Sequence, residues 1–203
     1  MLSNKVSILI PSIRPDKLIR CVTAIHDQID MPKDNYEVLV KTDSPGTRIG
    51  VTSVLFSLVE QSKYEFVMFL GDDTVPLNGF MKNAFETMRN FQDGWGLVGL
   101  NEGTDLCNRV ATHWLASKKL LPYLDGEFFH RGYRHCFCDN ELTERSASLG
   151  RFAWSKEAKI FHDHPILQGK SIKGTEYEIV YTPNNYYHDM RLFKRRKANG
   201  WKT

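Results

Sequence analysis

The chain has 203 residues, of which 41% are hydrophobic and 25% charged, and its formal net charge is +3. This length suits one compact domain with its own core, and the small net charge gives no argument for a polyanionic partner. The apolar N-terminal stretch is too short for a signal peptide, and about 18 uncharged apolar residues nowhere run together. These features predict a cytoplasmic protein without an integral membrane segment.

The four cysteines contain no Cys-x-x-Cys pair, so we expect free thiols; they are Cys21, Cys107, Cys136 and Cys138. The alternative is a zinc site in which the last two cysteines combine with His162 and His164. Both spacings are shorter than those usual for zinc ligands, which favours the free thiols.

Short apolar runs alternate with amphipathic segments over the first hundred residues. We expect strands at residues 6–10, 36–41, 65–70 and 96–100. Between them, Pro15 can begin one helix, residues 51–58 have helical apolar spacing, and a third helix starts near Asn78 or Gly79 with Asn78 as its N-cap. This alternation predicts an α/β fold with a mostly parallel sheet that helices flank on both faces.

The second half of the chain is less regular. After Leu100 the sequence becomes rich in glycine, asparagine, histidine and aromatic residues, and only residues 139–149 have the pattern of a further helix, closed by Gly150. The basic run at residues 194–197 is typical of a solvated helix face or a frayed tail.

The apolar run at residues 66–70 leads directly into Asp72 and Asp73. In open α/β sheets, ligands bind beyond the carboxyl ends of the strands. Paired carboxylates at that place suit a divalent cation, which in turn can hold a phosphate group. A solvated turn before Pro76 is the alternative. The pattern favours an enzyme that binds a sugar nucleotide.

Over residues 4–165 the sequence resembles the GT-A glycosyltransferases, in particular their inverting family 2. The resemblance rests on the opening strand Val-Ser-Ile-Leu-Ile-Pro-Ser, the strand that ends at Asp43, the Phe-Leu-Gly-Asp-Asp-Thr motif, the Asp-Asn-Glu-Leu-Thr-Glu-Arg segment from Asp139, and the Ala-Lys-Ile-Phe-His segment that ends at His162. Two positions depart from the family pattern: Gly71 stands where the Asp-x-Asp motif has its first acid, and Cys138 stands where glutamate usually precedes the catalytic aspartate.

The resemblance implies a GT-A (Rossmann-like) domain in three parts. Residues 1–105 form the nucleotide-sugar-binding half, residues 106–185 the acceptor and catalytic half, and residues 186–203 a basic C-terminal tail. It also implies that the donor nucleotide contacts Pro11 and Ser12, Asp43, Asp72 and, by a looser match, Arg48. Ordinary turn chemistry at strand ends is the alternative for Asp43 and the Pro11–Ser12 loop.

For the metal, the resemblance implies Asp73 and His162 as ligands. Carboxylate oxygens suit Mg²⁺ or Mn²⁺, and an added imidazole shifts the preference toward Mn²⁺. His164 and His188 are competing ligand candidates, and a hydrogen-bonded histidine without a metal is the alternative for His162.

For catalysis, the resemblance implies that Asp139 is the general base, which accepts the proton of the attacking acceptor hydroxyl. Its alternative role is that of a helix N-cap, because a carboxylate is stabilised at a helix N-terminus. Glu141 is the alternative base.

The function expected is inverting transfer of a sugar from a nucleotide-diphospho-sugar, with a UDP-sugar favoured, to a glycan or another hydroxyl acceptor. The same chemistry on a modified base in DNA is an alternative acceptor. A nucleotidyltransferase and a degenerate nucleotide-sugar-binding protein are the alternative functions. The nucleotidyltransferase lacks support because residues 11–17 are not the glycine- and arginine-rich opening loop of such enzymes.

Overall fold

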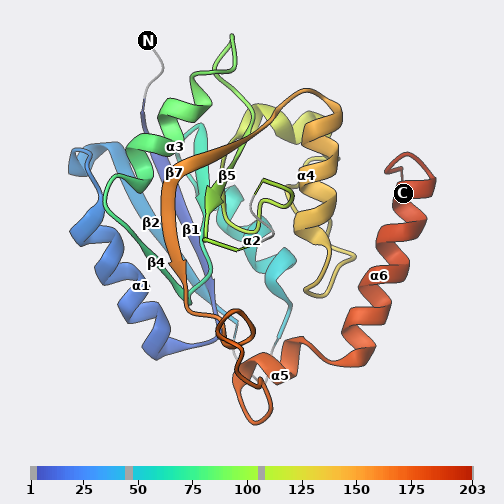
Figure 1. The fold of residues 1–203 in the computed structure, drawn as a ribbon. Coiled ribbons are helices and arrows are strands. Elements are labelled where there is room, and N and C mark those ends of the chain that lie inside the picture. Colours follow the sequence, from blue (N-terminus) through green and yellow to red (C-terminus); the bar gives the residue numbers. More distant parts are fainter. Residues whose placement is uncertain (1–3, 44–47, 105–107, 203) are drawn as a thin grey trace.

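A computed structural model describes residues 4–43, 48–104 and 108–202. Its strands form one seven-stranded sheet in the order β2-β1-β3-β6-β5-β7-β4 (Figure 1). The strands are β1 (Val6–Ser12), β2 (Tyr36–Thr42), β3 (Phe66–Phe69), β4 (Thr74–Pro76), β5 (Leu97–Asn101), β6 (Trp114–Ser117) and β7 (Phe152–His162). The four strands expected in the first half are thus present, with ends shifted by one or two residues.

The sheet combines two kinds of pairing. β1 pairs in parallel with both β2 and β3, and β5 pairs in parallel with β7. β6 runs antiparallel between β3 and β5, and β4 runs antiparallel to β7. The α/β class is therefore confirmed, but the sheet is mixed and only its β2-β1-β3 part is continuously parallel.

Six α-helices surround the described sheet: α1 (Pro15–Gln28), α2 (Val51–Gln61), α3 (Phe80–Met88), α4 (Cys138–Ser148), α5 (Glu176–Val180) and α6 (Pro183–Ala198). Pro15 is the first residue of α1, where its missing N–H costs no hydrogen bond. The expected N-cap at Asn78 is wrong, because the cap position of α3 is Gly79, whose φ of 77° favours glycine. Gly150, with φ 67°, ends the region of α4 as expected.

Alternation along the strands divides the core between the two faces of the sheet. Ile8 and Ile10 of β1 point into a cluster with α1 and α3, whereas Leu9 points into a second cluster with α2, α4 and α6. β3 is buried along its whole length because it lies between β1 and β6 and has helices on both faces. This packing fixes the end of β3, where the acidic motif begins.

The C-terminal part is integrated into the fold. Helix α6 starts at Pro183, before the boundary expected at residue 186, and lies beyond α4 at the side of the molecule (Figure 1). Arg196 from the basic run is only 3% exposed and pairs with Glu141 of α4. The expectation of a solvated face or frayed tail is therefore wrong for Arg196, although Lys194, Arg195 and Lys197 are exposed.

Cys21, Cys136 and Cys138 carry free thiols, and Cys107 lies outside the described residues. Among the helices that the structure describes, none has the length and apolar character needed to cross a membrane.

Candidate functional site

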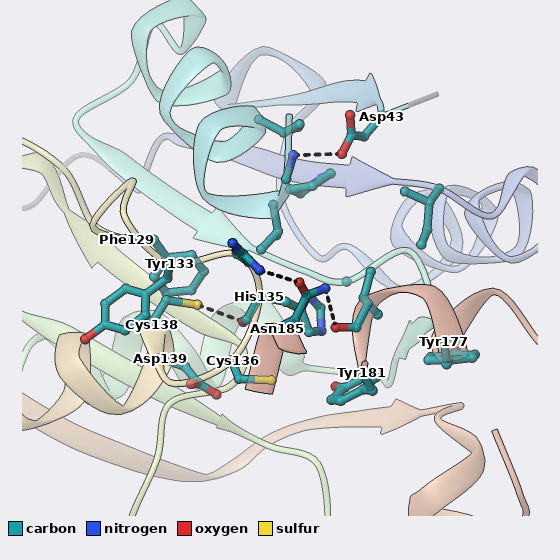
Figure 2. A pocket seen from close by; sticks show the side chains of 18 of the residues that line it. Asp43, Phe129, Tyr133, His135, Cys136, Cys138, Asp139, Tyr177, Tyr181 and Asn185 are labelled. Carbon is teal, nitrogen blue, oxygen red and sulfur yellow. Dashed lines mark hydrogen bonds between the residues drawn. The ribbon is translucent and has the colours of Figure 1, made fainter. Parts of the chain in front are cut away.

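A cleft with a volume of about 1020 Å³ opens at the carboxyl ends of β1, β2 and β3. All eight residues expected at the site line this cleft: Pro11, Ser12, Asp43, Arg48, Asp72, Asp73, Asp139 and His162. Figure 2 shows that its walls come from distant parts of the chain, with Asp43 following β2 on one side and Asp139 of α4 on the other. The fold thus brings together residues that the sequence separates by up to 151 positions, from residue 11 to residue 162.

Asp72 is bonded within the protein. Its Oδ2 accepts hydrogen bonds from Ser12 Oγ (2.9 Å) and from the backbone N–H groups of Ile13 and Arg14 (both 3.0 Å). Its Oδ1 accepts from Nε (2.8 Å) and Nη2 of Arg14. Both oxygens of this 1% exposed carboxylate are therefore occupied. In the described structure, Asp72 thus binds Arg14 and the loop after β1, and it lines the cleft.

Asp43, just after β2, binds the start of helix α2. Its two carboxylate oxygens accept hydrogen bonds from the backbone N–H groups of Ile49 (2.9 Å) and Gly50 (3.0 Å), just before α2. Beside it in the cleft, Nε and Nη1 of Arg48 are buried and have no hydrogen-bond partner among the residues that the structure describes. An unpaired buried donor costs free energy. The two nitrogens of the Arg48 guanidinium are therefore suited to bind an anionic ligand.

The candidate metal centre contains one residue that the sequence did not reveal. One ligand atom each from Asp73, His113 and His162 lies within 4.8 Å of the others. The antiparallel pairing of β4 with β7 places His162 opposite Thr74, which brings its ring to the acidic motif. His113 immediately precedes β6, and the irregular sequence around it gave no periodicity that would have indicated its place. These three side chains fit a divalent cation.

Glu102 lies behind the two imidazole rings. Its Oε2 is 2.7 Å from Nδ1 of His162 and 3.4 Å from Nδ1 of His113. A carboxylate on the far nitrogen of a histidine is the usual device that orients the ring toward a metal. Burial would raise the pKa of Glu102, but the nearby imidazoles of His113 and His162 outweigh this effect and lower the pKa.

Asp73 is already surrounded by donors. Its Oδ2 accepts from the hydroxyl of Tyr177 (2.7 Å) and lies 3.2 Å from Nη1 of Arg14 and 3.5 Å from Nε2 of His162. Burial alone would raise the pKa of Asp73, but the hydrogen bond with His162 and the charge of Arg14 hold it well below the usual range. Burial would lower the pKa of His162, but interactions with Asp73 and, next, with Glu102 raise this pKa to about 9.

The other histidines have separate places. His164 lines the cleft, and its Nδ1 accepts from the N–H of Ile166; its buried Nε2 has no partner in the described part of the chain. His188 makes its contact with Asp189. Neither belongs to the group around Asp73, and among the described residues Cys136 and Cys138 do not join a metal-binding group either. The zinc alternative therefore has no support.

Asp139 lies in the first turn of α4 and faces the cleft. Its Oδ1 accepts from the N–H of Asn140 (2.9 Å), while burial raises its pKa to about 6. The N-cap position belongs to Phe137, whose φ of 64° is rare for a residue other than glycine. A carboxylate with a raised pKa in a cleft has the properties of a general base near neutral pH.

The alternative base, Glu141, is a structural residue. It is 3% exposed and accepts hydrogen bonds from Tyr133, Arg145 and Arg196. Another buried acid, Asp189, lies in α6. It accepts hydrogen bonds from the backbone N–H groups of three consecutive residues, 134 to 136, at 2.8 to 2.9 Å. Helix α6 therefore fixes both the loop that leads into α4 and α4 itself.

Comparison with known proteins agrees with this geometry. No protein-family model matches the sequence, and no curated protein matches it significantly. Solved glycosyltransferases match the structure. S. aureus TarS is 15% identical over 95% of this chain, with a TM-score of 0.66. The mannosyltransferase PcManGT from Pyrobaculum calidifontis, in complex with GDP-Man and Mn²⁺, is 15% identical over 94% of this chain, with a TM-score of 0.70.

A third match is a mutant of Drosophila β1,4-galactosyltransferase 7 in complex with manganese, UDP-Gal and xylobiose, with 12% identity over 88% of this chain and a TM-score of 0.59. The chain spans 39% of the length of TarS, 64% of that of PcManGT and 79% of that of the galactosyltransferase. At these identities the likeness establishes the fold alone: the chain has the GT-A fold that these solved structures share.

Proposed function

We propose that the protein is an inverting, metal-dependent glycosyltransferase that moves a sugar from a nucleoside-diphospho-sugar to an acceptor hydroxyl. The observation that carries the proposal is that a candidate metal centre at Asp73 and a carboxylate with a raised pKa, Asp139, face the same cleft. Each alone is common in proteins, but together they supply the two groups that this reaction needs.

The donor is expected on the side of the cleft formed by the ends of β1 and β2. The unpaired nitrogens of Arg48 are available to the diphosphate, and the Pro11–Ser12 loop and Asp43 border the space for the nucleoside. A divalent ion held by Asp73, His113 and His162 would neutralise the charge that develops on the leaving diphosphate. A UDP-sugar remains the favoured donor, with Mn²⁺ as the favoured ion.

Asp139 is expected to take the proton of the acceptor hydroxyl as its oxygen attacks the anomeric carbon. Attack from the face opposite to the leaving diphosphate inverts the configuration in one displacement. Burial suits this role, because it raises the basicity of the carboxylate toward the working pH. The acceptor we propose is a glycan or another hydroxyl compound. The modified base in DNA remains its alternative.

The experiment is a thermal-shift series with UDP, GDP, CDP and TDP and their common sugars, each with and without Mn²⁺, followed by assay of donor hydrolysis for any nucleotide that binds. The proposal predicts that one nucleotide raises the melting temperature only in the presence of the metal, and that its sugar is released slowly to water. Metal-independent binding without turnover would instead support a degenerate binding protein.

A further inference from the structure

Position 71 has no room for a side chain, which explains why it is glycine. A Cβ on Gly71 would lie 2.6 Å from Oδ1 of Asp73 and 3.2 Å from Nε2 of His113. Gly71 is not one of the glycines with positive φ, so the backbone itself would accept another residue. The imidazole of His113 therefore stands beside the space that the first acid of an Asp-x-Asp motif would enter.

The surroundings of His113 suit a ligand. The ring is 4% exposed, lines the cleft and packs at a right angle against His162, with 4.6 Å between ring centroids. Nδ1 of His162 hydrogen-bonds Oε2 of Glu102 at 2.7 Å, and Nδ1 of His113 lies 3.4 Å from the same oxygen without hydrogen-bond geometry. With Nδ1 turned toward Glu102, Nε2 of each ring is left for the space next to Asp73.

We propose that His113 replaces the missing acid of the motif, and that the site is a centre of two histidines and one carboxylate that binds transition-metal ions in preference to Mg²⁺. Mg²⁺ favours oxygen ligands and keeps its water, whereas imidazole nitrogen favours first-row transition metals. Affinity should rise from Mg²⁺ to Mn²⁺ to Co²⁺, following the general order for nitrogen-containing sites. This inference deepens the proposed function, because the ion would serve the same diphosphate.

The first experiment measures binding of Mg²⁺, Mn²⁺ and Co²⁺ alone by calorimetry, with the Mn²⁺ electron-spin-resonance signal as a second readout. We expect Mn²⁺ to bind at least tenfold more tightly than Mg²⁺. His113→Gln should weaken Mn²⁺ binding at least tenfold, while His188→Gln, which changes another histidine of the cleft, should not. Equal affinity for Mg²⁺ and Mn²⁺, or unchanged Mn²⁺ binding in His113→Gln, would overturn the proposal.

The second experiment places an acid at position 71 and removes the imidazole at position 113. Its first readout is the melting temperature of the metal-free protein. Gly71→Asp alone should lower the melting temperature, because the new side chain meets His113 and Asp73. In the His113→Gly background the same change should cost clearly less, and the double variant should bind Mg²⁺ more tightly than His113→Gly alone. Additive losses of stability with no gain in Mg²⁺ binding would show that the two positions do not share one space.

The outcomes separate this inference from the proposed function. If wild type binds Mn²⁺ through His113 but releases no sugar from any nucleotide-sugar, the metal centre stands and the transferase proposal fails. If a nucleotide-sugar is turned over equally well with Mg²⁺ and with Mn²⁺, and His113→Gln binds Mn²⁺ normally, the transferase proposal stands and this one fails.

Discussion

Tyr177 donates its hydroxyl hydrogen to Oδ2 of Asp73 across 2.7 Å, so the short helix α5 reaches the carboxylate that follows β3. The ring of Tyr177 also lies 4.2 Å below the guanidinium of Arg14 and 4.4 Å from the ring of His164. The segment that follows β7 therefore contacts the candidate metal centre through the buried side chain of Tyr177.

Tyr177→Phe removes this hydrogen bond and keeps the ring. A hydrogen bond to a charged group contributes about 1.5 to 3 kcal/mol, so we expect the metal-free protein to lose about that much free energy of unfolding. Urea denaturation measures the change. Tyr187→Phe, which alters a tyrosine that is 53% exposed, should stay within about 0.5 kcal/mol of wild type. Equal stability of the two variants would mean that the Tyr177 hydroxyl contributes nothing to the centre.

Asp139→Asn should stabilise the protein at neutral pH. Burial raises the pKa of Asp139 to about 6, above its ordinary value of 3.8, so the folded state binds this proton more tightly than the unfolded state. The stability that the protonated acid contributes is present below pH 3.8 and is lost as the pH rises through about 6. We expect Asp139→Asn to gain about 1 to 3 kcal/mol at pH 7.5 and nothing at pH 4. A loss of stability at pH 7.5 would contradict the unfavourable burial of this charge.

Turnover should depend on the ionised form of the same residue. With a pKa of about 6, Asp139 is ready to accept a proton above that pH, so the rate of donor hydrolysis should fall as the pH decreases through 6. Asp139→Asn should bind the nucleotide normally and lower the rate by about 10² to 10⁴. Glu144→Gln, on the same helix, is the matched control and should keep wild-type turnover. A flat rate profile between pH 5 and 7 would assign the base to another group.

Arg48→Met tests the nucleotide side of the cleft. Two nitrogens of this guanidinium are buried and have no partner within residues 4–43, 48–104 and 108–202, so the substitution should leave the stability of the free protein unchanged or slightly higher. Binding of UDP with Mn²⁺ should weaken about 10- to 100-fold, the equivalent of one hydrogen bond between charged groups. Calorimetry on this variant and on Arg195→Met, an exposed cation of α6, gives the comparison. Unchanged UDP affinity would exclude Arg48 from the donor site.

The strands of the first half, and with them the place of the acidic motif, could be predicted from sequence. Apolar runs mark those strands, and the rule that ligands bind beyond the carboxyl ends of strands placed Asp73 in a cleft. The partners of Asp73 could not be predicted in the same way. His113 lies in an irregular segment, and nothing local distinguishes it from a surface histidine. Asp72 has the same sequence context as Asp73, and only the folded loop shows that Arg14 and Ser12 occupy its oxygens.

The burial of Arg196 could not be predicted from the sequence for a related reason. A basic run near a chain end is typical of an exposed face, and its partner Glu141 lies 55 residues earlier in the chain. Only the packing of α6 against α4 reveals that one cation in the run is buried while its neighbours are exposed. Pairings of this kind depend on tertiary structure, which hydrophobic periodicity does not encode.

Arg196→Met should therefore destabilise the whole domain. The guanidinium of Arg196 donates to both oxygens of Glu141, and removing it leaves a buried carboxylate with Tyr133 and Arg145 as its remaining partners. Breaking a buried pair on one side costs about 3 to 5 kcal/mol. Arg195→Met, which changes the exposed neighbour, should cost less than about 0.5 kcal/mol.

A double-mutant cycle measured by urea denaturation separates this pair from general loss of packing. Adding Glu141→Gln to Arg196→Met removes the stranded charge, so the double variant should be more stable than the sum of the two single losses predicts, by at least about 1 kcal/mol. Because Leu192 packs in the second core cluster and Arg196 pairs with buried Glu141, deletion of the residues after Arg191 should unfold the domain. A truncated chain that melts cooperatively near the wild-type temperature would show that α4 and the loop at residues 134–136 are positioned without the end of α6.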